Sequence, residues 1–502
     1  MARYLTTDNT SPAVPLADIP ELPYGELYDD LADRLAQERY HLAHYFAREE
    51  GERLRFYVIL LDDADHKILV SSFAMGYHDE APLPSLTALR PAAHPFERDI
   101  AERYGVRFDS MPWDKPLRLP ADRRANITNY PFYTIEGDSL HEVNVGPIHA
   151  GIIEPGAFRF ICNGETVLHL EIALGYQHRG IEKLMAATGN RLRQSALAES
   201  IAGDTAVAGA TAFAEAVEKL AAQAAPEALV TERAVALELE RMAMHIADTG
   251  ALSMDVGYQL GQVACEALRT MTINTTQAWC GNRFGKGLVR PFGTNKPLTA
   301  EKVTMIRRNV AEIARRYNEV RQDIKSSPTL LARYEQCGVV PRAEMLRIGG
   351  VGMAARASGV ERDLRVSHPS GIFARGIAHE SIVKRHGDVM ARLMMRCREV
   401  LQSAEYIDRM LESYAPAAQM PRPDYEQGLA PDSLAVGLVE AWRGELCHVA
   451  VTDGRGRIAD YRVKDPSLHN WLALALAVRG EGISDFPICN KSFNLSYCGH
   501  DL

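Results

Sequence analysis

The sequence has no long apolar run and no excess of basic charge. No stretch approaches the roughly 18 to 20 uninterrupted apolar residues that cross a bilayer, and the first residues lack the basic and then apolar pattern of a signal peptide. The formal net charge is −9, with Lys and Arg dispersed among acidic residues, so no basic field exists for nucleic acid. We therefore expect a chain that lies outside the membrane and does not bind nucleic acid.

Paired cysteines and common cofactor motifs are also missing. The eight cysteines include no CxxC pair, which excludes a zinc ribbon or an iron–sulfur ligand set, and we expect ordinary buried thiols. The sequence contains no GxGxxG that opens a helix after a strand, no GxxxxGK[ST], no HExxH and no GxSxG. Readings as an NAD enzyme, a nucleotide-phosphate enzyme or a serine hydrolase therefore lack support.

What is present begins with a small α+β pattern. Apolar spacing predicts a helix over residues 24–49, followed by strands over 54–63 and 67–75. Three prolines then break regular structure, and residues 120–133 look like a linker that wraps on a surface. These features predict a small N-terminal α+β domain, residues 1–125.

The rest of the chain is mostly helical in its periodicity. Between residues 184 and 410, apolar residues recur at i, i+3, i+4 and i+7, which predicts a bundle of amphipathic helices, among them one long run over 231–277. A strand, turn, strand and helix pattern follows over 445–478. The predicted fold class is α+β, in which residues 126–502 form a mainly helical bundle domain with small peripheral β-sheets.

Several motifs carry a resemblance to respiratory complex I. Residues 84–118, "PSLTALRPAAHPFERDIAERYG" and onward, resemble the 30 kDa-type subunit. The stretches that resemble the 49 kDa-type subunit are 146–160, 174–184, 350–369 and 439–454. That subunit is related to the large subunits of energy-converting (group 4) nickel–iron hydrogenases, and the fused arrangement looks most like the formate hydrogenlyase and hydrogenase-4 type.

The resemblance implies a metal site whose ligands are missing. Such hydrogenases bind nickel and iron through one CxxC pair before an alanine-rich helix and a second near the C-terminus, four thiolates that suit a soft metal. Matching the motifs places the first pair on Ala202 and Thr205 and the second on Ser496 and Gly499. The resemblance therefore implies no metal and no cofactor in this chain. A one-residue shift of register, which would let Cys498 and His500 touch an ion, stays open.

The equivalent cavity of complex I takes a quinone headgroup, held by a histidine loop and a tyrosine. Here the loop reads "HAGIIEPG" over 149–156, and the tyrosine position falls on Gly203. Both familiar contacts are absent, so a quinone remains a candidate ligand only if it binds in a new way.

Glu154 matches a hydrogenase carboxylate that passes protons beside the metal. A carboxylic acid in a partly dry cavity has a raised pKa and suits a relay; the alternative is a carboxylate that caps a loop. His149, in the same loop, has a catalytic and a loop-pinning interpretation that the sequence does not separate. We also expect Asp204 to bind a helix N-terminus, a cation or water, with Arg443 as the natural cationic partner.

We expect Glu154, Asp204, Arg443 and His500 to form one polar cluster in the emptied cavity. His178 and Arg179 lie on a turn that, by the resemblance, faces the last iron–sulfur cluster of a partner small subunit. His245 points toward the same region. Cationic or titratable groups there would tune the cluster's potential, whereas the alternative is that these residues only pin loops.

Two functions from different classes follow. The first is the peripheral-arm large subunit of a membrane-bound, complex I-like oxidoreductase that couples electron transfer to ion translocation without a nickel–iron site of its own. Its partners would be an iron–sulfur small subunit and membrane-embedded ion-translocating subunits, on the cytoplasmic side of the membrane. The second is a structural, proton-coupling scaffold with a vestigial cavity, which a cavity filled by Tyr497 and Phe493 would favour.

Overall fold

An antiparallel sheet with two helices forms the N-terminal part of the chain. The structure is a computed structural model that describes residues 2–77, 79, 81–118, 130–150, 153–416 and 419–502. The sheet has the order β1-β5-β4-β3. Its elements and helices are β1 (Leu5–Thr7), β3 (Tyr40–Glu50), β4 (Arg53–Asp62), β5 (Lys67–Gly76), α1 (Tyr24–Arg34) and α2 (His94–Tyr104). Leu27 and Leu31 of α1 and Phe96 and Ile100 of α2 share one core with the sheet.

The predicted helix over residues 24–49 is wrong beyond its first half. Helix α1 ends at Arg34, and strand β3 begins at Tyr40. Seven consecutive residues of β3 are buried, because Leu42 and Ala47 pack toward the helices while Ala43 and Phe46 pack on the opposite face. A strand buried on both faces shows no alternation of apolar and polar residues, and the buried His41 and His44 make β3 less apolar than β4 and β5, which are also buried on both faces. The strands predicted over 54–63 and 67–75 are confirmed as β4 and β5.

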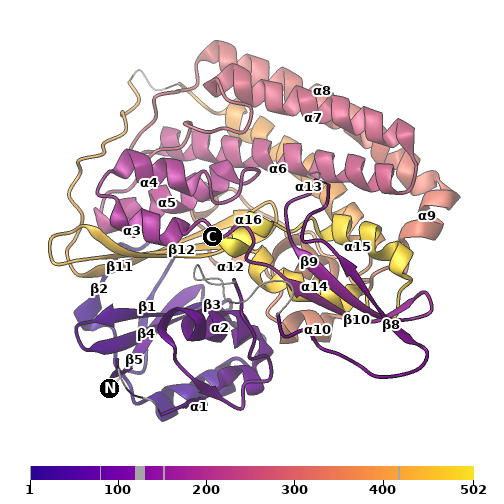
Figure 1. Cartoon of the computed structure of the whole chain (residues 1–502). Coiled ribbons are helices and arrows are strands. Elements are labelled where there is room, and N and C mark those ends of the chain that lie inside the picture. The colour runs from indigo at the N-terminus through magenta and orange to yellow at the C-terminus, as the bar shows by residue number, and fades with distance from the viewer. Residues whose placement is uncertain (1, 78, 80, 119–129, 151–152, 417–418) are drawn as a thin grey trace.

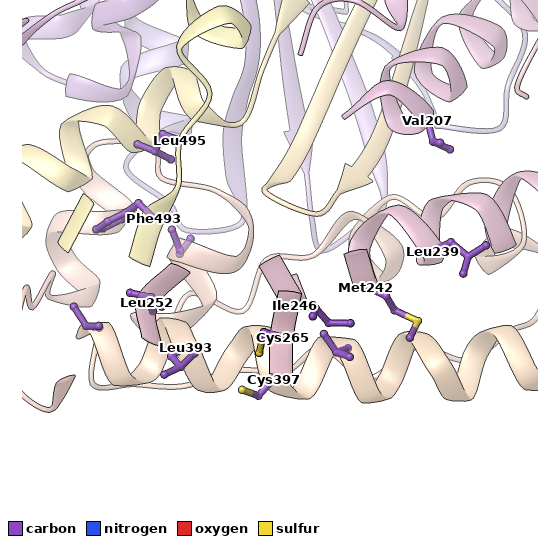
Figure 2. Packing of buried hydrophobic residues seen from close by; sticks show 14 of the residues in the cluster. Val207, Leu239, Met242, Ile246, Leu252, Cys265, Leu393, Cys397, Phe493 and Leu495 are labelled. Atoms are coloured by element: carbon purple, nitrogen blue, oxygen red, sulfur yellow. The ribbon is translucent and has the colours of Figure 1, made fainter. Parts of the chain in front are cut away.

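The predicted helical bundle is confirmed. Its long helices are α5 (Ala206–Leu220), α6 (Glu227–Asp255), α7 (Gln259–Cys280), α8 (Ala300–Ser326) and α13 (Val389–Glu412). Helix α6 is buried along most of its length and contacts α7 and α13, and Figure 2 shows Met242, Ile246 and Cys397 in this packing. The run predicted over 231–277 is two helices, broken where Gly257 adopts φ +74°.

A second four-stranded sheet lies between the N-terminal sheet and helix α5 (Figure 1). Its order is β13-β12-β11-β2, with β2 (Val14–Pro15), β11 (Ser433–Ala441), β12 (Gly444–Thr452) and β13 (Ile458–Lys464). Leu434, Val436 and Leu438 of β11 face the N-terminal sheet, whereas Ala435 and Val439 face α5. The two parts of the chain therefore share a hydrophobic core, and the domain boundary at residue 125 remains a prediction.

A three-stranded sheet and short helices complete the part that positions the site. The sheet has the order β10-β9-β8, and its β8–β9 connection carries His149 and Glu154. The remaining elements are β6 (Leu83–Pro84), β7 (Phe108–Asp109), β8 (Leu140–Val145), β9 (Ala157–Asn163), β10 (Thr166–Ala173), α3 (Ile181–Ala187), α4 (Arg191–Ala198), α9 (Pro328–Tyr334), α10 (Arg342–Arg347), α11 (Gly352–Ala357), α12 (Leu364–Ser367), α14 (Ser467–Ala477), α15 (Phe486–Phe493) and α16 (Tyr497–Asp501). Most of the linker predicted over 120–133 lies outside the described residues. Within the described ranges, no helix has both the length and the apolar character needed to cross a membrane.

Candidate functional site

The segments that the sequence places at one cavity do meet in the fold. The Arg443 side chain, in the β11–β12 turn, donates through Nε to the Asn494 carbonyl at 2.6 Å and reaches Asp204 in the loop before α5. The backbone N–H of Tyr497, at the start of α16, donates to Glu154 Oε2 at 3.2 Å. Loop, turn and C-terminal helix are thus held together by polar contacts.

Asp204 and Arg443 form a bidentate ion pair at the centre of this site. The two guanidinium nitrogens lie 2.8 and 2.6 Å from the carboxylate oxygens, and the guanidinium stacks 3.9 Å from the Trp442 ring centroid. Although burial opposes ionisation, Arg443 holds the pKa of Asp204 below its usual range. The predicted pairing is confirmed. The alternative, a helix cap, is wrong because Thr205 occupies the N-cap position of α5.

The side chains at the four thiolate positions do not fit a four-thiolate metal site. Ala202 has no donor atom, and the Thr205 hydroxyl accepts from Trp442 Nε1 at 3.2 Å. Ser496 caps α16 by accepting from the Gly499 N–H at 2.9 Å. A Cβ atom at Gly499 would lie 2.4 Å from Asp465 Oδ2, so this position has no room for a cysteine unless Asp465 moves.

Cys498 and His500 do not complete an ion site either. Within the described part of the chain, no group of three or more His, Cys, Asp and Glu side chains is arranged to hold a metal ion. Burial and the nearby Glu154 raise the pKa of Cys498 to about 11, so its thiol is neutral. His500 Nδ1 lies 2.8 Å from Asp501 and its carbonyl accepts from Arg118, and its place in the polar cluster remains a prediction.

Glu154 and His149 lie at the rim of the site, in a turn whose residues 151 and 152 are outside the described ranges. His149 Nε2 donates to the Gly156 carbonyl at 2.9 Å, a contact that pins the turn. Tyr497 fills the space beside it, since its ring lies 4.7 Å from Trp471 and a Cβ at Gly156 would approach its Cε1 to 2.7 Å. The catalytic assignments of Glu154 and His149 remain predictions.

His178 and Arg179 are tied to the same loops. His178 Nδ1 donates to the Asp501 carbonyl at 2.7 Å, and the Arg179 guanidinium donates to the carbonyls of Ser200 and Ile201 at 2.7 and 2.8 Å. Arg179 is exposed and His178 half-buried. The turn therefore both supports the loop before α5 and presents a cation to the surface, and its place beside a partner cluster stays a prediction.

His245 belongs to a buried ionic network that sequence reasoning missed. It is fully buried, Nε2 donates to Glu399 at 2.8 Å, and Nδ1 accepts from Arg396 at 3.2 Å. Burial lowers the pKa of His245 to about 4, so the ring is neutral. Arg396 also pairs with Asp248 at 2.6 Å. The only sequence signal for this network is the unusual number of charged residues at core-facing helix positions, such as Arg356 and Arg396, both fully buried.

The sequence of this chain matches two subunit types of respiratory complex I. Residues 25–132 match the family described as respiratory-chain NADH dehydrogenase, 30 Kd subunit, and residues 255–431 match the corresponding 49 Kd subunit. The chain joins these two subunit types in one polypeptide. It is a complex I-like, hydrogenase-related protein of the oxidoreductase class, as the sequence motifs indicate.

The chain is similar to several named subunits. Formate hydrogenlyase subunit 5 of Escherichia coli is 27% identical, with 82% of this chain and 76% of the relative covered, and hydrogenase-4 component G of the same organism is 25% identical, with 89% and 80% covered. NADH-quinone oxidoreductase subunit 4 of Thermus thermophilus is 27% identical, with 68% and 89% covered. A chain of the membrane-bound sulfane sulfur reductase, an archaeal respiratory membrane complex, has the same fold, with a TM-score of 0.67, 22% identity, and 74% of this chain and 100% of that chain covered.

Proposed function

We propose that this chain is the peripheral-arm large subunit of a membrane-bound complex that couples electron transfer to ion translocation, and that it holds no nickel–iron site. The observation that supports the absence of a nickel–iron site is the Asp204–Arg443 ion pair. Asp204 lies in the loop where the family resemblance places the first thiolate pair. An ion pair neutralises itself and needs no metal cation as a counter-charge.

The proposal includes partners. The relatives named above belong to formate hydrogenlyase, hydrogenase-4 and NADH-quinone oxidoreductase. The exposed Arg179 beside His178 suits a docking site for an iron–sulfur small subunit, and membrane-embedded subunits would hold the assembly on the cytoplasmic side of the membrane. A cation near an iron–sulfur cluster raises its reduction potential.

A second candidate function is a proton-coupling scaffold without redox turnover in this chain. Its support is the packing of the cavity: Tyr497 is 5% exposed against Trp471, and Phe493 is 1% exposed under the Arg392 guanidinium. A quinone headgroup would have to displace these side chains. Both candidate functions include an iron–sulfur cluster on a partner subunit and ion or proton coupling through this chain.

The test is purification of the intact complex through a tag on this chain. We expect an iron–sulfur subunit to co-purify, iron in stoichiometric amount, no nickel, and no hydrogen uptake with an artificial acceptor. Arg179→Ala should weaken retention of the small subunit, whereas Arg315→Ala, which changes an exposed arginine on α8, should not. Stoichiometric nickel would contradict the proposal, and retention of the small subunit by both variants would remove Arg179 from the interface.

A further inference from the structure

Two cavities lie beside α5 and share Glu215 of that helix as a lining residue. The outer one opens to solvent, has a volume of about 440 Å³, and is bordered by Asn9, Lys219 and Arg375. The inner one has a volume of about 50 Å³. The two cavities share five of their lining residues: Glu215, Val230, Arg233, Ser370 and Gly371. These residues form the throat between solvent and the interior.

Glu215 is the carboxylate of the throat, and like Arg233 Nε it has unused hydrogen-bonding capacity among the described residues. Its Oε1 accepts a long hydrogen bond of 3.4 Å from the Ser370 hydroxyl, while Oε2 is shielded from solvent and has no hydrogen-bond partner among the described residues. A shielded carboxylate oxygen without a partner is costly while charged. The group is therefore more stable when it carries a proton.

The cations around Glu215 bind other groups, although Arg233 Nε has no hydrogen-bond partner among the described residues. Lys219 donates to Asn9 and to the Val436 carbonyl at 2.9 and 2.6 Å, and Arg233 makes a bidentate pair with Glu218 at 2.9 and 2.6 Å. The charged or titratable groups that line the two cavities with Glu215 are Glu218, Lys219, Arg233, Glu238, Arg241, Arg365, His368, Arg375 and Glu440. Burial outweighs the nearby cations and raises the pKa of Glu215 to about 7.

The inner cavity ends on the buried ionic network. Glu238 and Arg241 line it, and Arg241 Nε lies 3.2 Å from Glu238 and Nη1 3.5 Å from Glu399. Glu399 in turn accepts from His245 at 2.8 Å. The throat therefore leads from solvent to the first member of the network.

The network continues to the loop before α5, residues 199–205, where the resemblance places the first thiolate pair. Arg396 contacts His245 at 3.2 Å and Asp248 at 2.6 Å, and Asp248 accepts from the Asn494 side chain at 2.6 Å. The Asn494 carbonyl accepts from Arg443, the partner of Asp204. Polar groups thus follow one another across the core from α6 to that loop.

The size of the inner cavity limits what enters it. A volume of about 50 Å³ holds roughly three to five water molecules at about 10–15 Å³ each, whereas organic ligands occupy pockets of roughly 300 Å³ or more. Apolar side chains make up most of the lining, but Glu215, Glu238 and Arg241 also line the cavity and supply the polar partners that a bound water molecule needs. Water and protons are the ligands that fit.

We propose that Glu215 is a proton-exchange site at the entrance of this network, through which the core of the chain takes up and releases protons from solvent. The inference rests on the proposed coupling function and adds the residue at which protons enter the chain. No covalent or redox step is involved, since one proton moves between solvent water and a Glu215 carboxylate oxygen. A carboxyl group that titrates near neutral pH suits this exchange.

The test compares Glu215→Gln with Glu227→Gln, an exposed glutamate in the first turn of α6, in the purified complex. Infrared difference spectra recorded across a pH titration should show a protonated carboxyl band that disappears with an apparent pKa near 7. We expect Glu215→Gln to lose this band and Glu227→Gln to retain it. At neutral pH, turnover should fall at least about tenfold in Glu215→Gln only.

The outcomes separate this inference from the proposed function. A band that survives in Glu215→Gln overturns the assignment, even in a complex with full turnover. A complex without turnover contradicts the coupling function, while loss of the band would still place proton exchange at Glu215. If the Glu215→Gln complex does not assemble, carbodiimide labelling of the wild-type complex tests the assignment instead, because carbodiimide reacts with a protonated, accessible carboxyl group. Labelling of Glu215 that depends on pH would support the proton-exchange site. Absence of labelling at Glu215 would overturn it.

Discussion

The Asp204 carboxylate receives two hydrogen bonds from the Arg443 guanidinium, at 2.8 and 2.6 Å, in the loop where the resemblance to nickel–iron hydrogenases places a thiolate pair. The Arg443 side chain is 4% exposed and that of Asp204 35% exposed. The arginine therefore depends on this carboxylate for charge compensation more than the carboxylate depends on the arginine.

Removal of Asp204 should destabilise the chain strongly. Asp204→Ala leaves a buried guanidinium without its counter-ion, which costs about 3–5 kcal/mol of unfolding free energy. Replacing both partners, Asp204→Ala with Arg443→Met, should recover much of that loss. Urea denaturation of the purified chain measures both. The control is Glu319→Ala, which breaks an exposed pair with Arg315 and should cost about 1 kcal/mol or less. Equal losses of unfolding free energy in Asp204→Ala and Glu319→Ala would contradict the prediction.

A side chain at Gly499 should be poorly tolerated. The Cβ of Gly499→Ala would meet Asp465 Oδ2 at 2.4 Å and Ser496 Oγ at 2.9 Å, so we expect a loss of about 1–3 kcal/mol from overpacking. Gly203→Ala is the matched control, because a Cβ there meets no atom within 4 Å. Thermal unfolding of the two variants compares them. A Gly499→Ala variant as stable as Gly203→Ala would show that the site has room for the missing cysteine.

The stability of the chain should fall with rising pH because of Glu240. This α6 carboxyl accepts from the N–H groups of Val207 and Ala208 at 2.7 and 3.2 Å, and burial raises its pKa to about 8. The folded state then holds a proton that the unfolded state, with a pKa near 4.3, releases. The stabilising effect is complete below about pH 4 and is lost as pH rises toward 8.

Glu240→Gln removes this dependence. Between about pH 5 and pH 8, we expect the unfolding free energy of the wild type to fall by about 3 kcal/mol relative to that of Glu240→Gln. Urea denaturation at several pH values measures the difference, with the exposed Glu227→Gln as the control that should follow the wild type. Parallel pH profiles for wild type and Glu240→Gln would mean that Glu240 is ionised in the folded chain.

Glu154→Gln tests the relay interpretation of the emptied site. The amide oxygen still accepts from the Tyr497 N–H, so the complex should assemble and keep the partner's cluster. Because an amide does not exchange a proton at neutral pH, proton-coupled turnover should slow by about 100-fold or more. Full turnover in an assembled Glu154→Gln complex would contradict the relay interpretation and favour the scaffold interpretation.

The long helices follow from periodicity, and the sequence predicts strands with a strongly apolar composition better than strands with a mixed composition. Strands β4 and β5 are buried on both faces and are predicted nonetheless, whereas the sequence predicts a helix for most of β3, which contains the buried His41 and His44. The resemblance located Asp204 and Arg443, which lie 239 positions apart. Nothing in the sequence distinguishes Glu215 from other polar residues on α5, because its role depends on the cavities on either side of it.

The pairing of β2 with β11 has a consequence for synthesis. Val14 and Pro15 pair with Leu434 and Ser433, about 420 residues later in the chain. Ribosomes add roughly 5–20 residues per second, so the N-terminal strand waits about 20 to 80 s for its partner. During that interval the face of the N-terminal sheet that β11 and β12 later cover, including Phe46 and Tyr57, has no permanent cover. We expect the nascent chain to need a chaperone, or an early-bound subunit, until its last seventy residues emerge.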